Sequence, residues 1–163
     1  MSPSLREHLE AQFRRATIAS NDLREAFQFA ETAAATEEWI VREGLLQAAV
    51  VSYARAFVAS EGGGESSTAL PGSFLREFSP EEREAHDRIL RVRHSVVAHS
   101  DYETNRVSEL SISPGGYSLS LGRDNVRFHV GGVGPLRTQC WRAYLLSQLH
   151  GNDLVARIRA LAT

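Results

Sequence analysis

The residues best suited to chemistry are concentrated in the stretch 91–102, which reads Arg-Val-Arg-His-Ser-Val-Val-Ala-His-Ser-Asp-Tyr. The unperturbed pKa of a histidine lies near neutrality, so His99 is a candidate for accepting or releasing a proton. Arg93 is a candidate for binding a phosphate group, because a guanidinium offers paired donors to phosphate oxygens. Cleavage of RNA at its own 2′-hydroxyl without a metal would use these two kinds of group.

The spacing of this stretch predicts where its side chains lie on a helix. Ile89, Val92 and Val96 fall on one side at about 100° per residue. Arg93 and His99 fall on opposite borders of this apolar stripe, roughly 120° apart and about 9 Å apart along the axis. Both are therefore expected to be half-buried. One helix cannot easily bring both onto one phosphate, so we expect two copies of the helix, paired along the stripe by a two-fold axis, to form a shared cleft.

These residues resemble a known motif. Arg93-His94, four further residues and His99 resemble the R-x(4–6)-H motif of HEPN domains (higher eukaryotes and prokaryotes nucleotide-binding), in which the residue after the arginine is usually polar. The run Val-Val-Ala-His-Ser-Asp around His99 resembles the abortive-infection and toxin branch. Arg88 and His94 have the same spacing, and the Arg93 register is preferred because both of its groups border the apolar stripe.

The resemblance implies a fold, an activity and partners. It implies a mainly α-helical bundle that forms a homodimer through its motif helices. The expected activity is metal-independent cleavage of an RNA substrate in the dimer cleft, with no cofactor, in the setting of a toxin or an antiviral defence system. Arg93 would bind the phosphate, and His99 would act as acid and base.

Five neighbours could support these two catalytic residues: His94, His86, Ser100, Asp101 and Tyr102. His94 is either a second polar group in the cleft or exposed. His86, two turns before the motif arginine, either lines the same cleft or is an ordinary surface histidine. Ser100 and Asp101 either orient the catalytic histidine or cap the end of the helix.

Tyr102 bears on a further partner. HEPN toxins that are paired with a minimal nucleotidyltransferase antitoxin carry the motif R-x(4)-H-x-Y, and that tyrosine receives AMP groups. Here the spacings are R-x(5)-H and H-x-x-Y. A cognate nucleotidyltransferase-like antitoxin is therefore one possible partner, and modification of Tyr102 stays open.

Composition argues against several other kinds of protein. A net charge of −2 argues against a protein that coats nucleic acid nonspecifically. The single cysteine, Cys140, excludes an intrachain disulfide and is expected in the core, and no Cys/His spacing suits a metal. No apolar run reaches the length of a signal peptide core or a membrane span, so we expect a cytoplasmic protein without a membrane partner.

The chain is predicted to form one domain, 1–163, with four to five helices and a small antiparallel β-hairpin or sheet of two or three strands before the last helix. Ser79-Pro80-Glu81-Glu82 is typical of a helix start, and turn-forming residues at 20–22 and 151–153 could bend their helices. The expected elements are a helix at 4–34, a helix at 37–60, a loop at 61–78, the motif helix at 80–100, a β-hairpin region at 106–130 and a helix at 136–162.

The second of these helices is expected to be central. The segment 45–57 is apolar on more than one side, which predicts contact with both the core and a partner. Tyr53 and Phe57 are interpreted as interface packing in preference to an RNA-stacking platform. Gly44 inside this helix suggests a close approach of another helix.

A second function is compatible with the same residues. The chain could be a HEPN-like dimerisation module that binds a nucleotide, RNA or protein without turning it over. This alternative predicts binding that depends on Arg93 and no RNA product.

Overall fold

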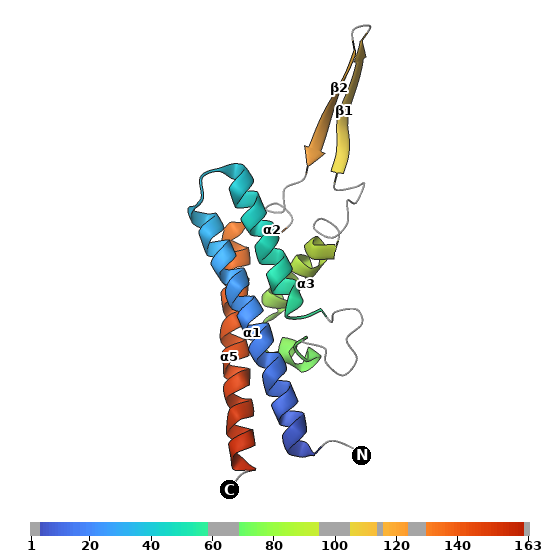
Figure 1. Ribbon diagram of the computed structural model, residues 1–163. Helices are drawn as coiled ribbons and strands as arrows, with labels where there is room; N and C mark the ends of the chain where they lie inside the picture. Colours follow the sequence, from blue (N-terminus) through green and yellow to red (C-terminus); the bar gives the residue numbers. More distant parts are fainter. Residues whose placement is uncertain (1–3, 59–68, 95–104, 114–115, 124–129, 162–163) are drawn as a thin grey trace.

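In the computed structural model, the described residues are 4–58, 69–94, 105–113, 116–123 and 130–161, with backbone only for 105–123. The elements in chain order are α1 (Leu5–Ala35), α2 (Trp39–Arg55), the 3₁₀-helix η1 (Gly72–Glu77), α3 (Pro80–Val92), β1 (Asn105–Ser113), β2 (Gly116–Arg123) and α5 (Val133–Ala160). α1 and α5 run antiparallel and side by side, α2 packs on α1, and α3 crosses nearby (Figure 1).

α1 begins where the sequence offers a complete cap. The Ser4 side chain accepts from the Glu7 backbone N–H, and the Glu7 carboxylate accepts from the Ser4 backbone N–H. This capping box satisfies two of the N–H groups that a helix start leaves unpaired. α3 begins in the same way, with Ser79 and Glu82. Both starts follow from local sequence, and the predicted start of the motif helix is confirmed.

α1 packs through small residues. Its buried hydrophobic positions recur at heptad spacing, which keeps one narrow face turned toward neighbouring helices. Five of them are alanine, and we call this set the alanine face of α1. Small side chains let the axes of packed helices approach closely. The alanine face and the two leucines that accompany it are Leu9, Ala16, Ala19, Leu23, Ala26, Ala30 and Ala33.

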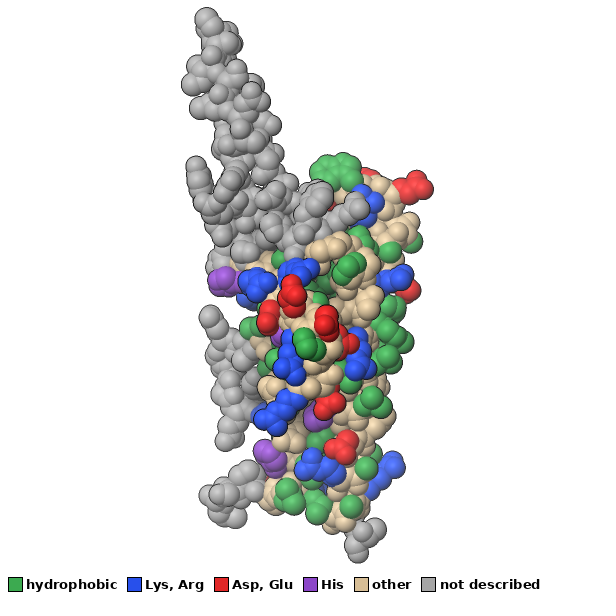
Figure 2. Space-filling view, turned by 180° about the vertical axis from the view of Figure 1, so that it is seen from behind, with side chains coloured by type: hydrophobic (Ala, Val, Ile, Leu, Met, Phe, Trp, Pro, Cys, Tyr) green, Lys and Arg blue, Asp and Glu red, His purple; other side chains and the backbone are tan. Residues whose placement is uncertain are grey.

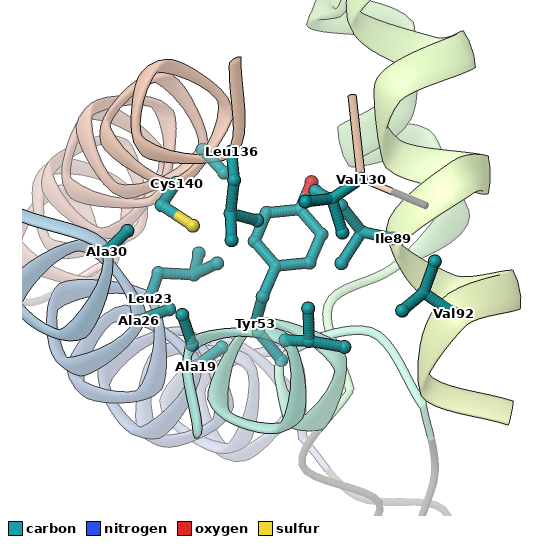
Figure 3. Packing of buried hydrophobic residues seen from close by; sticks show 14 of the residues in the cluster. Ala19, Leu23, Ala26, Ala30, Tyr53, Ile89, Val92, Val130, Leu136 and Cys140 are labelled. Atoms are coloured by element: carbon teal, nitrogen blue, oxygen red, sulfur yellow. The ribbon is translucent and has the colours of Figure 1, made fainter. Parts of the chain in front are cut away.

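The largest fully buried side chain, that of Tyr53, comes from another helix. Tyr53 of α2 is completely buried, and its ring extends across the core between Leu136 and Cys140 of α5 and Ile89 of α3 (Figure 3). The expectation that Cys140 lies in the core is confirmed. Tyr53 belongs to the core of its own chain, so its interpretation as interface packing is wrong.

The predicted break in the last helix and the predicted close approach at Gly44 are wrong, whereas the predicted helix 4–34 is confirmed. α1 continues through 20–22, where Ser20 is buried and accepts a hydrogen bond from Gln148 Nε2 of α5. α5 continues through 151–153, because Leu154 is fully buried in a cluster with Leu9. Gly44 has open space where a Cβ would stand, so it marks no close helix approach.

Two boundaries differ from the prediction. α2 ends at Arg55, earlier than the predicted 60. The region predicted as loop 61–78 contains η1, whose Phe74 is buried. The buried ring of Phe74 anchors η1 to the core. The glycine, serine and proline residues of this segment predict a loop and give no sign of that anchor.

The predicted fold class needs correction in its β component. The described core consists of helices and the loops next to them, without a sheet among its layers. The two strands pair with each other alone, in antiparallel register with Leu110 opposite Leu119 and an irregularity between Val107 and Glu109. The hairpin extends away from the helices (Figure 1). The strands expected before the last helix therefore pair as a hairpin and do not form a layer of the helical bundle.

The third strand expected in this region falls almost entirely on 124–129, which lie outside the described part of the chain. Val130, which was expected to end it, lies in a turn and is buried in the helical core.

Candidate functional site

The predicted motif begins at the C-terminal end of α3. Ile89 and Val92 are 2% and 4% exposed and fix this helix against the core. Arg93 follows directly, and it is half-buried, as the stripe geometry predicted. His94 is exposed. Both residues continue the helix in a π-helical conformation, and single π-turns within helices are frequent at functional sites.

Most of the predicted site lies outside the described residues. His99, Ser100, Asp101 and Tyr102 all fall in 95–104, together with Val96 of the apolar stripe. Their positions relative to Arg93 are therefore not described. Their assignment stays a prediction from sequence.

The stripe itself has a different role from the one predicted. Ile89 and Val92 pack with Tyr53, Val50 and Leu136 in the core of the same chain. Two copies cannot pair along a stripe that is already covered. A dimer would have to use a different surface, with Arg93 at its border.

His86 is buried, so its interpretation as a surface histidine is wrong. It is 3% exposed and lies in a polar network inside the core. Gln139 Nε2 of α5 donates to the Tyr53 hydroxyl at 3.0 Å. That hydroxyl also lies 3.1 Å from His86 Nδ1, within hydrogen-bond distance. A neutral imidazole nitrogen can donate or accept in this contact.

The surroundings of His86 favour this neutral state. Phe57, Phe78 and Tyr53 surround its ring, with centroids 4.6, 5.9 and 5.9 Å away. Burial lowers the pKa of His86, and the Asp87 carboxylate opposes this only in part. Burial also raises the pKa of Tyr53, which keeps its hydroxyl protonated.

A surface hollow of about 300 Å³, here called the His86 pocket, opens beside this network. Two arginines line it, Arg76 from η1 and Arg83 from α3, and Asp87 adds one acid. Arg83 is held in place because its Nε donates to the Phe78 carbonyl oxygen at 3.2 Å. The full lining is Gly72, Leu75, Arg76, Arg83, His86 and Asp87.

Sequence reasoning missed most of these residues. Arg76 stands in a segment predicted to be loop, and Arg83 stands in the predicted motif helix but outside the motif itself. The burial of His86 had a detectable signal, since it lies three residues before Ile89, on the same helix side. Its partners Tyr53 and Gln139 are 33 and 53 residues away in sequence and carried no such signal.

The outer surface carries a mixture of charges. Arg55 pairs with Asp22 at 2.9 Å and with Glu25, and Arg142 pairs with Glu82 at 3.0 Å. Arginine and acidic side chains alternate on the face in Figure 2, and apolar side chains follow one edge. These ion pairs join neighbouring helices. Among the described residues, no group of three or more side chains that could bind a metal ion comes together.

Comparison with family models, curated proteins and solved structures finds no match to this chain. Among the described helices, none has the length and apolar character that crossing a membrane requires.

Proposed function

We propose that this chain is a HEPN-like metal-independent endoribonuclease that acts as a homodimer. The observation that supports the proposal is the position of Arg93. Its side chain is half-buried at the border of a packed helix, in a π-helical turn at the start of the motif. An arginine held at such a border presents its guanidinium to a bound phosphate with little loss of conformational freedom.

Each residue has a defined step in this reaction. His99 removes the proton from the ribose 2′-hydroxyl, whose oxygen then attacks the adjacent phosphorus. Arg93 stabilises the negative charge that develops on the phosphoryl oxygens. The bond to the 5′-oxygen of the next nucleotide breaks, and that oxygen takes up a proton. The products are a 2′,3′-cyclic phosphate and a free 5′-hydroxyl.

The proposal includes a setting. A toxin or antiviral-defence component that cleaves cellular RNA acts in the cytoplasm, where a nucleotidyltransferase-like antitoxin is the partner to look for. The dimer forms through a surface next to Arg93 and His94, because the apolar stripe of α3 lies in the core.

The test is incubation of the purified protein with total RNA and with tRNA in EDTA, followed by analysis of the product ends. The variants are Arg93→Ala and His99→Ala, and the matched control is His8→Ala, an exposed histidine on α1. Wild type and control should give 2′,3′-cyclic phosphate ends. Loss of the acid or base should slow cleavage by about 10²–10⁴-fold.

Full activity in His99→Ala would contradict the catalytic assignment. Absence of cleavage by a confirmed wild-type dimer, with RNA or nucleotide binding that Arg93→Ala abolishes, would contradict the nuclease assignment and support a non-catalytic binding module.

A further inference from the structure

We propose that the His86 pocket binds a phosphodiester group of the RNA substrate, a short distance along the strand from the cleavage site; this inference rests on the proposed function. The pocket brings two guanidinium groups to one hollow, and neither has an acidic partner among the ion pairs of the described residues. Five other arginines have such partners: Arg6, Arg55, Arg88, Arg142 and Arg157.

His86 is a buried part of the lining of the same hollow. Its Nδ1 lies 3.1 Å from the Tyr53 hydroxyl, and this contact holds the ring in place. A hollow lined by two arginines suits an oxygen anion, because each guanidinium offers paired hydrogen-bond donors to phosphate oxygens.

The charge of the pocket favours a phosphodiester over free phosphate. Arg76 and Arg83 supply two positive charges, His86 is neutral, and Asp87 supplies one negative charge. The sum is +1, which matches the single negative charge of a phosphodiester. The Asp87 carboxylate repels a second negative charge.

The pocket is well placed relative to the motif. His86 and Arg93 are seven residues apart, so they lie on nearly the same side of the helix and about 10 Å apart along its axis. A single RNA strand covers this distance within a few nucleotides. One strand could therefore contact the motif and the pocket together, and the arginines of the pocket would fix its register.

The test measures binding of a 2′-O-methyl RNA oligonucleotide, which cannot be cleaved, over a range of salt concentrations. The variants are Arg76→Gln and Arg83→Gln, singly and combined. The control is Arg137→Gln, which removes an exposed arginine from α5. Thermal unfolding confirms that each variant is folded. We expect the double variant to bind at least tenfold more weakly than the control, with the slope of log K against log salt reduced by about 0.7.

Affinity and slope equal to those of the control would overturn the pocket assignment and leave the nuclease proposal intact if wild type cleaves RNA. Binding by wild type without cleavage would contradict the nuclease proposal, and the double variant would still decide the pocket. Wild type that does not bind RNA would overturn both. Displacement of the RNA by inorganic phosphate at constant ionic strength would assign the pocket to free phosphate and overturn the RNA assignment.

Discussion

The hydroxyl oxygen of Tyr53 and Nδ1 of His86 lie 3.1 Å apart, and this contact joins α2 to α3 inside the core. Gln139 of α5 donates to the same hydroxyl, so a single oxygen connects three helices. A buried polar network of this kind restricts how the helices can pack, because each group must keep its partner. It therefore fixes the position of α3, on which the motif begins.

Replacement of Tyr53 by Phe should destabilise the protein by about 1–3 kcal/mol, because it leaves the Gln139 amide and His86 Nδ1 buried without their partner. Urea unfolding measures the free energy. Tyr144→Phe is the control, since that ring is half-buried and its hydroxyl makes no hydrogen bond to the described residues. Equal stability of the two variants would show that the network contributes nothing.

Stability should fall as the pH drops below about 6.5. Burial lowers the pKa of His86 in the folded protein, so the unfolded chain binds a proton in this range while the folded chain does not. The free energy of unfolding therefore decreases from pH 6.5 downward until the folded pKa is passed. His86→Leu should lose this component, whereas His8→Gln on the exposed surface of α1 should keep it. Urea unfolding at pH 7.5 and 5.5 compares the three proteins, and an unchanged pH dependence in His86→Leu would refute the assignment.

Leu23 is completely buried where α1 meets the core, and Ile18 on the same helix is 46% exposed. Leu23→Ala should cost about 2–5 kcal/mol through lost burial and the cavity left behind. Ile18→Ala should change stability by about 0.5 kcal/mol or less. Chemical unfolding of both variants tests whether α1 is oriented as described, and a reversed order of the two losses would mean that it is not.

Gly131 adopts φ +81° in the turn before α5, and an added Cβ would lie 2.7 Å from Nη1 of Arg88. Gly131→Ala should destabilise by about 1–3 kcal/mol through backbone strain. Gly134 has open space at its Cβ position and lies inside α5, so Gly134→Ala should be neutral or slightly stabilising. The difference in Tm between the two variants measures the effect, and a Gly131→Ala variant as stable as wild type would show that the turn relaxes.

The features that depend on residues close together in the sequence were predictable from the sequence. The capping boxes at Ser4 and Ser79 act over three residues, and the buried face of α3 with Ile89 and Val92 follows from helical periodicity. The half-buried position of Arg93 follows from the same periodicity. The continuity of α5 through 151–153 does not, because it depends on Leu154 packing beside Leu9 from the far end of the chain.

The candidate site was less predictable than the fold. His86 was recognised as a member of the motif helix, but its burial depends on Tyr53 and Gln139, which only the tertiary structure brings together. The prediction that two copies pair along the apolar stripe was wrong. Periodicity shows that a helix face is apolar, but it does not show which part of the structure covers that face. In this chain the α2 and α5 helices cover it.

The alanine face of α1 has a consequence for how this sequence can diverge. In most protein cores, the commonest damaging substitution replaces a large side chain by a smaller one and leaves a cavity. Here the spacing of the long helices depends on side chains that are already minimal, so almost any replacement at Ala19, Ala26 or Ala30 adds atoms where none fit. Distant relatives should therefore keep small residues along this face even after their larger core residues have been exchanged.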